Sequence, residues 1–381
     1  NRKKYSQNRL AKAFSLLSDV AFNGGNSLAA LQFAHYGSEA DDIDVLVRLD
    51  LLLKIARGYY AQGQYIELLE TSQKAASLAE QASNMNYHLQ ALAYSVVAYA
   101  LSADEALAVT KLRKVEDLLN RNQNNVDRII LLDIIAAGHF NLTEYENAVE
   151  LLNSVLNLRT EMGKTQGIAG TYHLLAQSYY QLQQYDNAYN AFWQSLQFSK
   201  QYQLKIRAAY AELGLGQVLY QQQQLSRSKQ RLQDALAVFK QYNLVREKLS
   251  TQISLVKVKY ALEQHAEADV ILLSAQSVAE KLLLSPQQIE LYLLLADYYQ
   301  SQQQFQQAIK AQKRYLTLYQ GLYPKVKVKN ALLTSEETAS NKTKQLALNL
   351  AEQSQLSLEF SEKFRRQKIL ITLLSFTIAC S

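Results

Sequence analysis

The chain has 381 residues, of which 48% are hydrophobic and 19% are charged, so the sequence can build a core and lacks the composition of a disordered protein. It contains only 12 glycines and 2 prolines, too few for the turns of a β-sandwich, a barrel or an α/β fold of this length. The composition therefore predicts an almost entirely helical protein. The single cysteine, Cys380, excludes an intrachain disulfide framework and any metal site built on several thiolates.

The formal net charge of +6 is concentrated near the two ends of the chain. Residues 1–12 carry five bases and no acids, and residues 321–370 carry nine bases and five acids, whereas the rest of the chain has 26 bases and 29 acids. This distribution argues against a nucleic-acid-binding face along the body of the protein. It suits contact between the basic ends and an anionic surface, of which a membrane is the simplest.

A period of 40 residues runs through most of the chain. One column of this repeat is always small or β-branched: Ala56, Val96, Ala136, Ala176, Gly216, Val256 and Ala296. A second column, twelve residues later, is small at nearly every position: Leu68, Ala108, Ala148, Ala188, Ser228, Ala268 and Ala308. An eighth copy, displaced by one residue, fits at Leu17, Val20, Ala29, Phe33 and Tyr36.

Each 40-residue unit is predicted to be a pair of antiparallel helices. Its apolar residues recur at helical spacing and are interrupted midway by a short polar stretch, such as residues 181–184. The small columns allow the two helices of a unit to approach to about 8–10 Å where they cross. Because a single helix pair cannot bury both of its faces, the units should stack into a solenoid over residues 1–321.

These units resemble the tetratricopeptide repeat over about residues 9–321. One copy carries the pattern of that family at Leu175, Ala176, Tyr179, Tyr185, Ala188 and Phe192. The resemblance implies an all-α fold, a right-handed superhelix of about eight helix hairpins. Two features depart from the family: the repeat is 40 rather than 34 residues long, and the proline that usually closes the second helix is absent. The dimensions of the groove therefore cannot be taken from the family.

The resemblance also places the first helix of each pair on the concave face, where ligands bind. The positions one, four and five residues after the small column, and the position three before it, then point into the groove. The candidate site consists of Tyr60, Phe140, His173, Gln177, Tyr180, Gln181, Gln217, Tyr220, Gln221, Lys257 and Tyr260. Tyrosine rings beside amides and few charges favour an uncharged or peptide-like ligand. The alternative is that the tyrosines only pack between repeats.

The pattern changes after Pro324. Residues 322–368 are expected to contain one long helix, over about residues 331–364. Its apolar residues form a weak heptad pattern, which fits either a helix packed on the last repeat or a dimeric coiled coil. Residues 369–381 are uncharged and shorter than the roughly 20 residues of a membrane span. We expect them to be the start of a transmembrane helix in a fragment of a longer protein. The alternative is a short apolar end that packs or inserts as a tail anchor.

The sequence offers little support for an enzyme. It has no zinc-protease, serine-hydrolase, phosphate-binding or paired-cysteine motif. His139 and His265 occupy columns that hold tyrosine in other repeats, so they are expected to fill the scaffold. We therefore expect no catalytic residue, no metal and no cofactor. The remaining enzymatic alternative would use His173 and Asp133, which should lie in adjacent repeats.

The order of these parts resembles the sensory region of bacterial membrane-bound signalling proteins. In that group the array is periplasmic, and an inner-membrane span leads to an output domain, often a GGDEF diguanylate cyclase or a histidine kinase. The resemblance implies a non-enzymatic sensor that binds a protein or peptide in its groove, with a homodimer through the tail helix as a further expectation. The bases at 363–368 precede the apolar run, and the positive-inside rule would place that side in the cytoplasm. A cytoplasmic scaffold for partner proteins is therefore the alternative.

Overall fold

The computed structural model describes residues 2–40, 42–102, 104–121, 127–165, 167–280, 282 and 285–322. All regular elements in these residues are helices, as the sequence predicts. In chain order they are α1 (Arg2–Asn23), α2 (Ser27–Ser38), α3 (Val45–Gln62), α4 (Tyr65–Gln81), α5 (Met85–Ser102), α6 (Glu105–Arg121), α7 (Arg128–Asn141), α8 (Tyr145–Glu161), α9 (Ile168–Gln181), α10 (Tyr185–Gln201), α11 (Lys205–Gln221), α12 (Leu225–Gln241), α13 (Val245–Ala261), α14 (His265–Ala279), α15 (Pro286–Ser301) and α16 (Phe305–Leu322).

The chain divides into two compact units, residues 1–323 and 324–381, and only the first is described. The expected long helix at 331–364 and the apolar run at 369–381 lie outside the described residues. Within the described part of the chain, none of the helices is both long enough and apolar enough to cross a bilayer.

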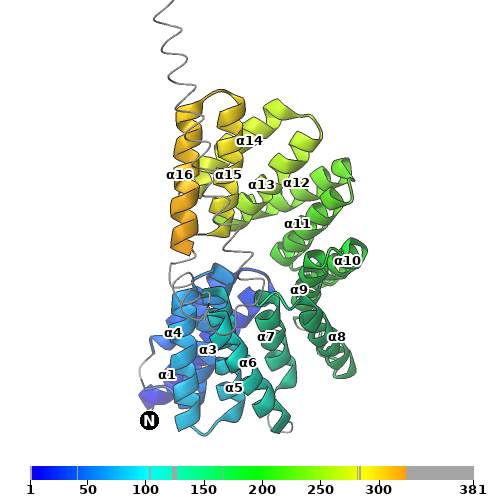
Figure 1. Cartoon of the computed structure of the whole chain (residues 1–381). Coiled ribbons are helices and arrows are strands. Elements are labelled where there is room, and N and C mark those ends of the chain that lie inside the picture. Colours follow the sequence, from blue (N-terminus) through cyan, green and yellow to red (C-terminus); the bar gives the residue numbers. More distant parts are fainter. Residues whose placement is uncertain are drawn as a thin grey trace, which may run out of the picture. The chain divides into compact units, whose positions relative to one another are not determined.

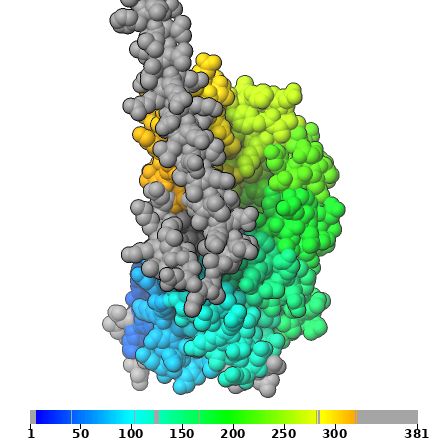
Figure 2. All heavy atoms as spheres, in the orientation of Figure 1, coloured from blue at the N-terminus to red at the C-terminus, as the bar shows by residue number. Residues whose placement is uncertain are grey.

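The helices form eight consecutive hairpins, shown in chain order in Figure 1. On the face drawn in Figure 2, the colours follow one another in sequence order from cyan through green to yellow, because each hairpin packs on its neighbours in the chain.

In the hairpins whose turns the structure describes in full, the turn contains a residue in the left-handed region. In the turn between α9 and α10, Gln183 has φ 60°, and the backbone N–H of Gln184 donates to the carbonyl of Tyr179 at 2.9 Å. This bond satisfies a carbonyl that the end of the helix would otherwise leave free. Equivalent left-handed residues stand at Gly63, Thr143, Gln183, Gln223, Glu263 and Gln303. The polar stretches at the 40-residue spacing are therefore the reversals of the chain.

The two small columns form the helix crossings at the core of the hairpins. Six of the seven residues of the first column are at most 4% exposed, and the seventh, Gly216, is buried as well. Gly216 is required by its partner helix, since a Cβ there would lie 2.6 Å from Cγ of the fully buried Leu232. Gly214 likewise faces the ring of Phe192. The two glycines thus serve close helix packing, and residues 40 apart have equivalent surroundings.

Candidate functional site

A pocket is lined by residues of four successive hairpins. It has a volume of about 250 Å³ and thirteen lining residues. Most of these come from the first helices of their hairpins, α9, α11, α13 and α15, and Phe192 and Leu232 of α10 and α12 also line it. The lining residues are Gln177, Tyr180, Gln181, Phe192, Gln217, Tyr220, Gln221, Leu232, Ser250, Ser254, Lys257, Val258 and Glu290.

Helical periodicity brings these side chains to one side. Gln177 and Gln181 lie one turn apart on α9, and Gln217 and Gln221 occupy the equivalent positions on α11. Because the hairpins repeat every 40 residues, the two glutamine pairs stand side by side. Seven of the eleven groove residues predicted from the sequence line this single pocket.

Hydrogen bonds connect the polar side chains from one helix to the next. The amide of Gln221 donates to the hydroxyl of Tyr180 at 2.9 Å, joining α11 to α9. The amide of Gln217 donates to Oγ of Ser254 at 3.3 Å, joining α11 to α13. Since a glutamine amide has two N–H donors and one acceptor oxygen, each retains capacity to bind a ligand.

The formal charges in the pocket neutralise each other. Lys257 on α13 and Glu290 on α15 form an ion pair, and their side chains are 40% and 45% exposed. The other lining residues are amides, hydroxyl-bearing residues and apolar residues. The pocket therefore presents hydrogen-bonding groups and aromatic surface with almost no net charge.

Three predicted groove residues lie outside the pocket lining and make packing contacts. The hydroxyl of Tyr60 accepts a hydrogen bond from the Asn141 amide at 3.1 Å, and burial raises the pKa of Tyr60. Phe140 packs edge to face on Tyr145. The hydroxyl of Tyr260 donates to Asp269 at 2.7 Å. Tyr60 therefore contacts a residue of another repeat, whereas Phe140 and Tyr260 contact the second helix of their own hairpin.

His173, the fourth, also lies outside the pocket lining, in an aromatic environment. Its ring makes edge contacts with Phe192 and Tyr210, at centroid distances of 5.3 and 5.9 Å. Among the described residues, its buried Nδ1 has no hydrogen-bond partner. Burial, together with the nearby charge of Arg207, lowers the pKa of His173 to about 3. The imidazole is therefore neutral at ordinary pH, and no described carboxylate is hydrogen-bonded to its Nδ1 to orient it as a base.

The structure gives no support to a catalytic pair of His173 and Asp133. The carboxylate of Asp133 accepts hydrogen bonds from Arg159 and from the hydroxyl of Thr171, the latter at 3.1 Å. Burial raises the pKa of Asp133, while the guanidinium of Arg159 opposes this rise. This arrangement joins α7, α8 and α9 as a structural ion pair. In the part of the chain that the structure describes, no group of three or more His, Cys, Asp or Glu is placed to hold a metal ion.

Six residues that line the pocket were not among the predicted groove residues, and three of them are polar: Ser250, Ser254 and Glu290. On α13 the small column is at Val256, and the predicted groove residue Lys257 follows it. Ser254 lies three residues before Lys257, and Ser250 lies four residues before Ser254. Steps of four and three residues keep side chains on one helix face. Applied from Lys257 toward the start of α13, these steps would have predicted both serines. Glu290 follows Ser250 by 40 residues, so the repeat would then have predicted Glu290 on α15.

No family model matches the sequence, and no curated protein matches it. Solved structures do resemble it. NprR in complex with its cognate peptide NprX is 18% identical, with 90% of this chain and 98% of that chain covered and a TM-score of 0.54. A Rap protein complexed with competence and sporulation factor is 13% identical, with 84% and 99% covered and a TM-score of 0.50.

A third structure is a signal-transduction ATPase with a tetratricopeptide repeat sensor from Pyrococcus horikoshii. It is 15% identical, with 77% of this chain and 50% of that chain covered and a TM-score of 0.51. At these identities the likeness shows the fold alone. The chain is a tetratricopeptide-like helical-repeat protein.

Proposed function

We propose that the repeat array binds an extended peptide, or an extended segment of a partner protein, in the pocket of α9, α11, α13 and α15, and that it performs no chemistry there. One observation carries the proposal. Amide and hydroxyl side chains from four successive helices converge on a single pocket whose two formal charges cancel. An extended backbone offers the alternating N–H and C=O groups that such side chains can pair with.

Each group in the pocket has a role in this proposal. The two glutamines of α11 exchange their present partners for backbone groups of the peptide: Gln221 releases Tyr180 and Gln217 releases Ser254. The two glutamines of α9 bind further backbone groups. The rings of Tyr180 and Tyr220 cover the side chains of the peptide, since aromatic rings supply contact area at a low cost in conformational entropy. Phe192 and Leu232 provide an apolar floor.

The comparisons support a peptide as the ligand class. NprR was solved with its cognate peptide, and a Rap protein was solved with competence and sporulation factor. Both are similar to this chain over more than four fifths of its length. The likeness is one of fold, so the identity of the peptide is open to selection experiments.

The test is to select peptides from a phage-displayed random library on the full chain and measure their affinity by fluorescence polarisation. The Tyr180→Ala/Tyr220→Ala variant should bind the selected peptides at least tenfold more weakly, which corresponds to about 1.4 kcal/mol. The matched control is Tyr202→Ala/Tyr242→Ala. These tyrosines are also 40 residues apart, are 41% and 38% exposed, and lie outside the pocket lining. Equal affinity in the two double variants would refute the assignment of the pocket.

We further propose that the array is the sensory part of a membrane-anchored bacterial signalling protein. The support is the basic run at 363–368 followed by the uncharged run at 369–381, together with the resemblance of architecture. In this proposal the array is periplasmic, the tail helix pairs two copies, and the signal reaches a diguanylate cyclase or histidine kinase. A reporter that is active only in the periplasm, fused after residue 320, separates this proposal from a cytoplasmic scaffold.

A further inference from the structure

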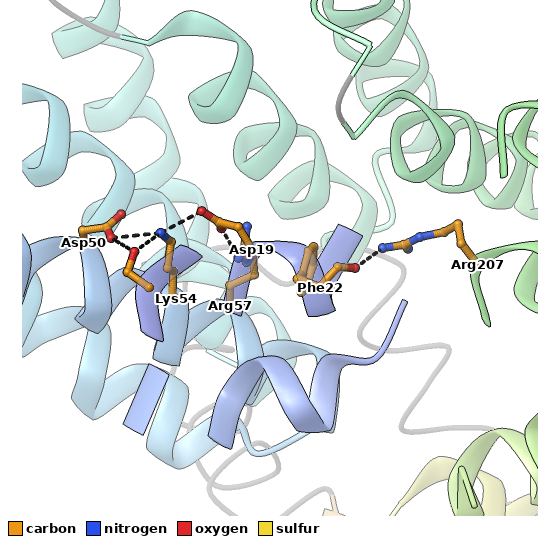
Figure 3. Close-up of polar contacts among 7 residues, drawn as sticks. Asp19, Phe22, Asp50, Lys54, Arg57 and Arg207 are labelled. Atoms are coloured by element: carbon orange, nitrogen blue, oxygen red, sulfur yellow. Dashed lines mark hydrogen bonds and ion pairs between the residues drawn. The ribbon is translucent and has the colours of Figure 1, made fainter. Parts of the chain in front are cut away.

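Two arginines connect hairpins that are far apart in the sequence. Arg207, in the first turn of α11, donates from Nη2 to the carbonyl of Phe22 at 2.6 Å, at the end of α1 (Figure 3). Arg246, in the first turn of α13, donates from Nη1 to the carbonyl of Ala61 at 3.2 Å, near the end of α3. The partners in each bond are separated by 185 residues. The described array thus curves far enough to return to its own first hairpins.

The two contacts are copies of one arrangement. Arg246 follows Arg207 by 39 residues, and Ala61 follows Phe22 by the same number. In each case an arginine at the start of one helix caps the carboxyl end of a helix from another part of the array. The last carbonyls of a helix lack intrahelical donors and carry a partial negative charge, which favours a cation there.

The first contact includes a cluster of charges around Phe22. The guanidinium of Arg207 lies over the Phe22 ring, 5.8 Å from its centroid, and that of Arg57 lies over the same ring at 4.0 Å. Arg57 is neutralised by Asp19, at 2.8 Å. Figure 3 shows the polar contacts that join Asp19 to Lys54 and Arg57, and separately the hydrogen bond between Arg207 and Phe22. Burial lowers the pKa of Arg207, and the charge of Arg57 acts in the same direction.

Glycine stands at both points of closest approach. Gly25 has φ +93°, and a Cβ there would lie 2.9 Å from the backbone nitrogen of Arg207. Gly63 has φ +71°, and a Cβ there would lie 3.0 Å from Nη2 of Arg246. At Gly25 the obstacle is backbone, which cannot move aside as a flexible side chain can. The approach of α11 to the turn between α1 and α2 therefore depends on the absence of a side chain at Gly25.

We propose that Arg207 and Arg246 form a two-point clasp that holds the array closed on itself and sets the width of the ligand pocket. The helices that carry the arginines, α11 and α13, also carry Gln217, Gln221 and Ser254 of the pocket. The two arginine side chains hold the clasp through hydrogen bonds and, at Arg207, a cation–π contact, beside the close approach of Gly25 to α11. Consecutive hairpins, in contrast, are joined through buried apolar columns. It can therefore open while each hairpin remains folded. The regulatory part of this proposal rests on the proposed peptide-binding function.

The clasp is tested by distance measurement on the full chain without ligand. Nitroxide labels are attached through Lys74→Cys on α4 and Gln233→Cys on α12, both exposed positions, in a Cys380→Ser background. Pulsed electron paramagnetic resonance should give one narrow distance distribution. In Arg207→Ala/Arg246→Ala we expect a longer mean distance and a broader distribution. The control, Arg231→Ala, removes an arginine that pairs with Glu212 inside one hairpin and should leave the distribution unchanged.

A second variant covers the case in which the double variant fails to fold, which circular dichroism would reveal. Gly25→Ala keeps both arginines and should open the array by inserting a Cβ against the backbone of α11. Unchanged distances in the folded variants would overturn the clasp.

The phage-selected peptides then test the coupling to the pocket. They should bind severalfold more weakly to the opened variant, and equal affinity would overturn the regulatory role while leaving the clasp intact. If no peptide is selected on the wild-type chain, the proposed function fails, and the label distances still decide whether the clasp exists.

Discussion

The substitution Gly214→Ala tests how closely the two helices of a hairpin pack. Gly214 lies inside α11, and a Cβ at this position would lie 2.6 Å from Cδ1 of Phe192 and closer still to Cε1 and Cζ. The Phe192 ring is 2% exposed and packs against His173, so it has little room to move. Overpacking of this kind costs about 1–3 kcal/mol. Alanine gains about 1 kcal/mol over glycine in a helix interior, so we expect a net destabilisation of up to about 2 kcal/mol.

The matched control is Gly170→Ala on α9. A Cβ there would lie at an ordinary contact distance of 3.8 Å from Nη1 of Arg207. The same substitution should therefore stabilise the protein by up to about 1 kcal/mol. Urea unfolding followed by circular dichroism measures both effects as shifts of the midpoint in opposite directions.

A double variant identifies the cause of the destabilisation. Phe192→Leu makes room for the new methyl group, so Gly214→Ala/Phe192→Leu should be more stable than the sum of the single effects by about 1 kcal/mol. If Gly214→Ala stabilised the protein as much as Gly170→Ala, the helices could not be as close as described.

Two histidines should give opposite pH dependences, and the pocket should give a weak salt dependence. Although burial lowers the pKa of His139, hydrogen bonds to Glu116 and Glu144 outweigh this effect and raise the pKa above 6.5. The wild-type protein should therefore be more stable than His139→Gln by the largest amount below pH 6.5. This difference in the free energy of unfolding should decrease as pH rises through the folded-state pKa. The pKa of His173 is depressed to about 3, so His173→Phe should gain stability relative to wild type, by up to about 1.4 kcal/mol per pH unit, as pH falls below 6.5. Urea midpoints at a series of pH values check both signs, and parallel pH profiles would contradict them. Because Lys257 and Glu290 neutralise each other, the affinity of selected peptides should change less than about threefold between 0.1 and 1 M salt. A steep dependence of the affinity on salt, measured by fluorescence polarisation, would contradict a neutral pocket.

The fold was predictable because its physical requirement recurs along the chain. A helix crossing needs a small residue, and the same need returns every 40 residues at positions such as Ala136 and Ala176, both of which are fully buried. The polar stretch after Tyr180 likewise marked a reversal of the chain, which Gln183 makes with a positive φ.

The candidate site was predictable only in part. Position within the repeat placed Gln177 and Gln217 on the concave face, but it could not show which hairpins combine into one pocket. Tyr60 and Tyr260 occupy the same column as Tyr180, yet they bond to Asn141 and Asp269. A long side chain at the edge of the concave stripe can turn toward a neighbouring helix or into the groove, and the partner that decides this lies elsewhere in the sequence.

The contacts of the clasp could not be predicted from the sequence, for a different reason. Its partners are separated by 185 residues, so their meeting depends on the accumulated curvature of several hairpins. A small error in the rotation per hairpin would move Arg207 away from Phe22. No local pattern around Gly25 or Gly63 distinguishes a point of close approach from an ordinary turn.

Hydrogen exchange with and without a selected peptide measures most directly where the ligand lies. If the peptide occupies the proposed pocket, amide exchange should slow in α11 and α13, whose side chains form its centre, and should be unchanged in α4 and α6. Slowed exchange confined to the second helices of the hairpins, α10, α12 and α14, would place the ligand on the outer face and contradict the groove.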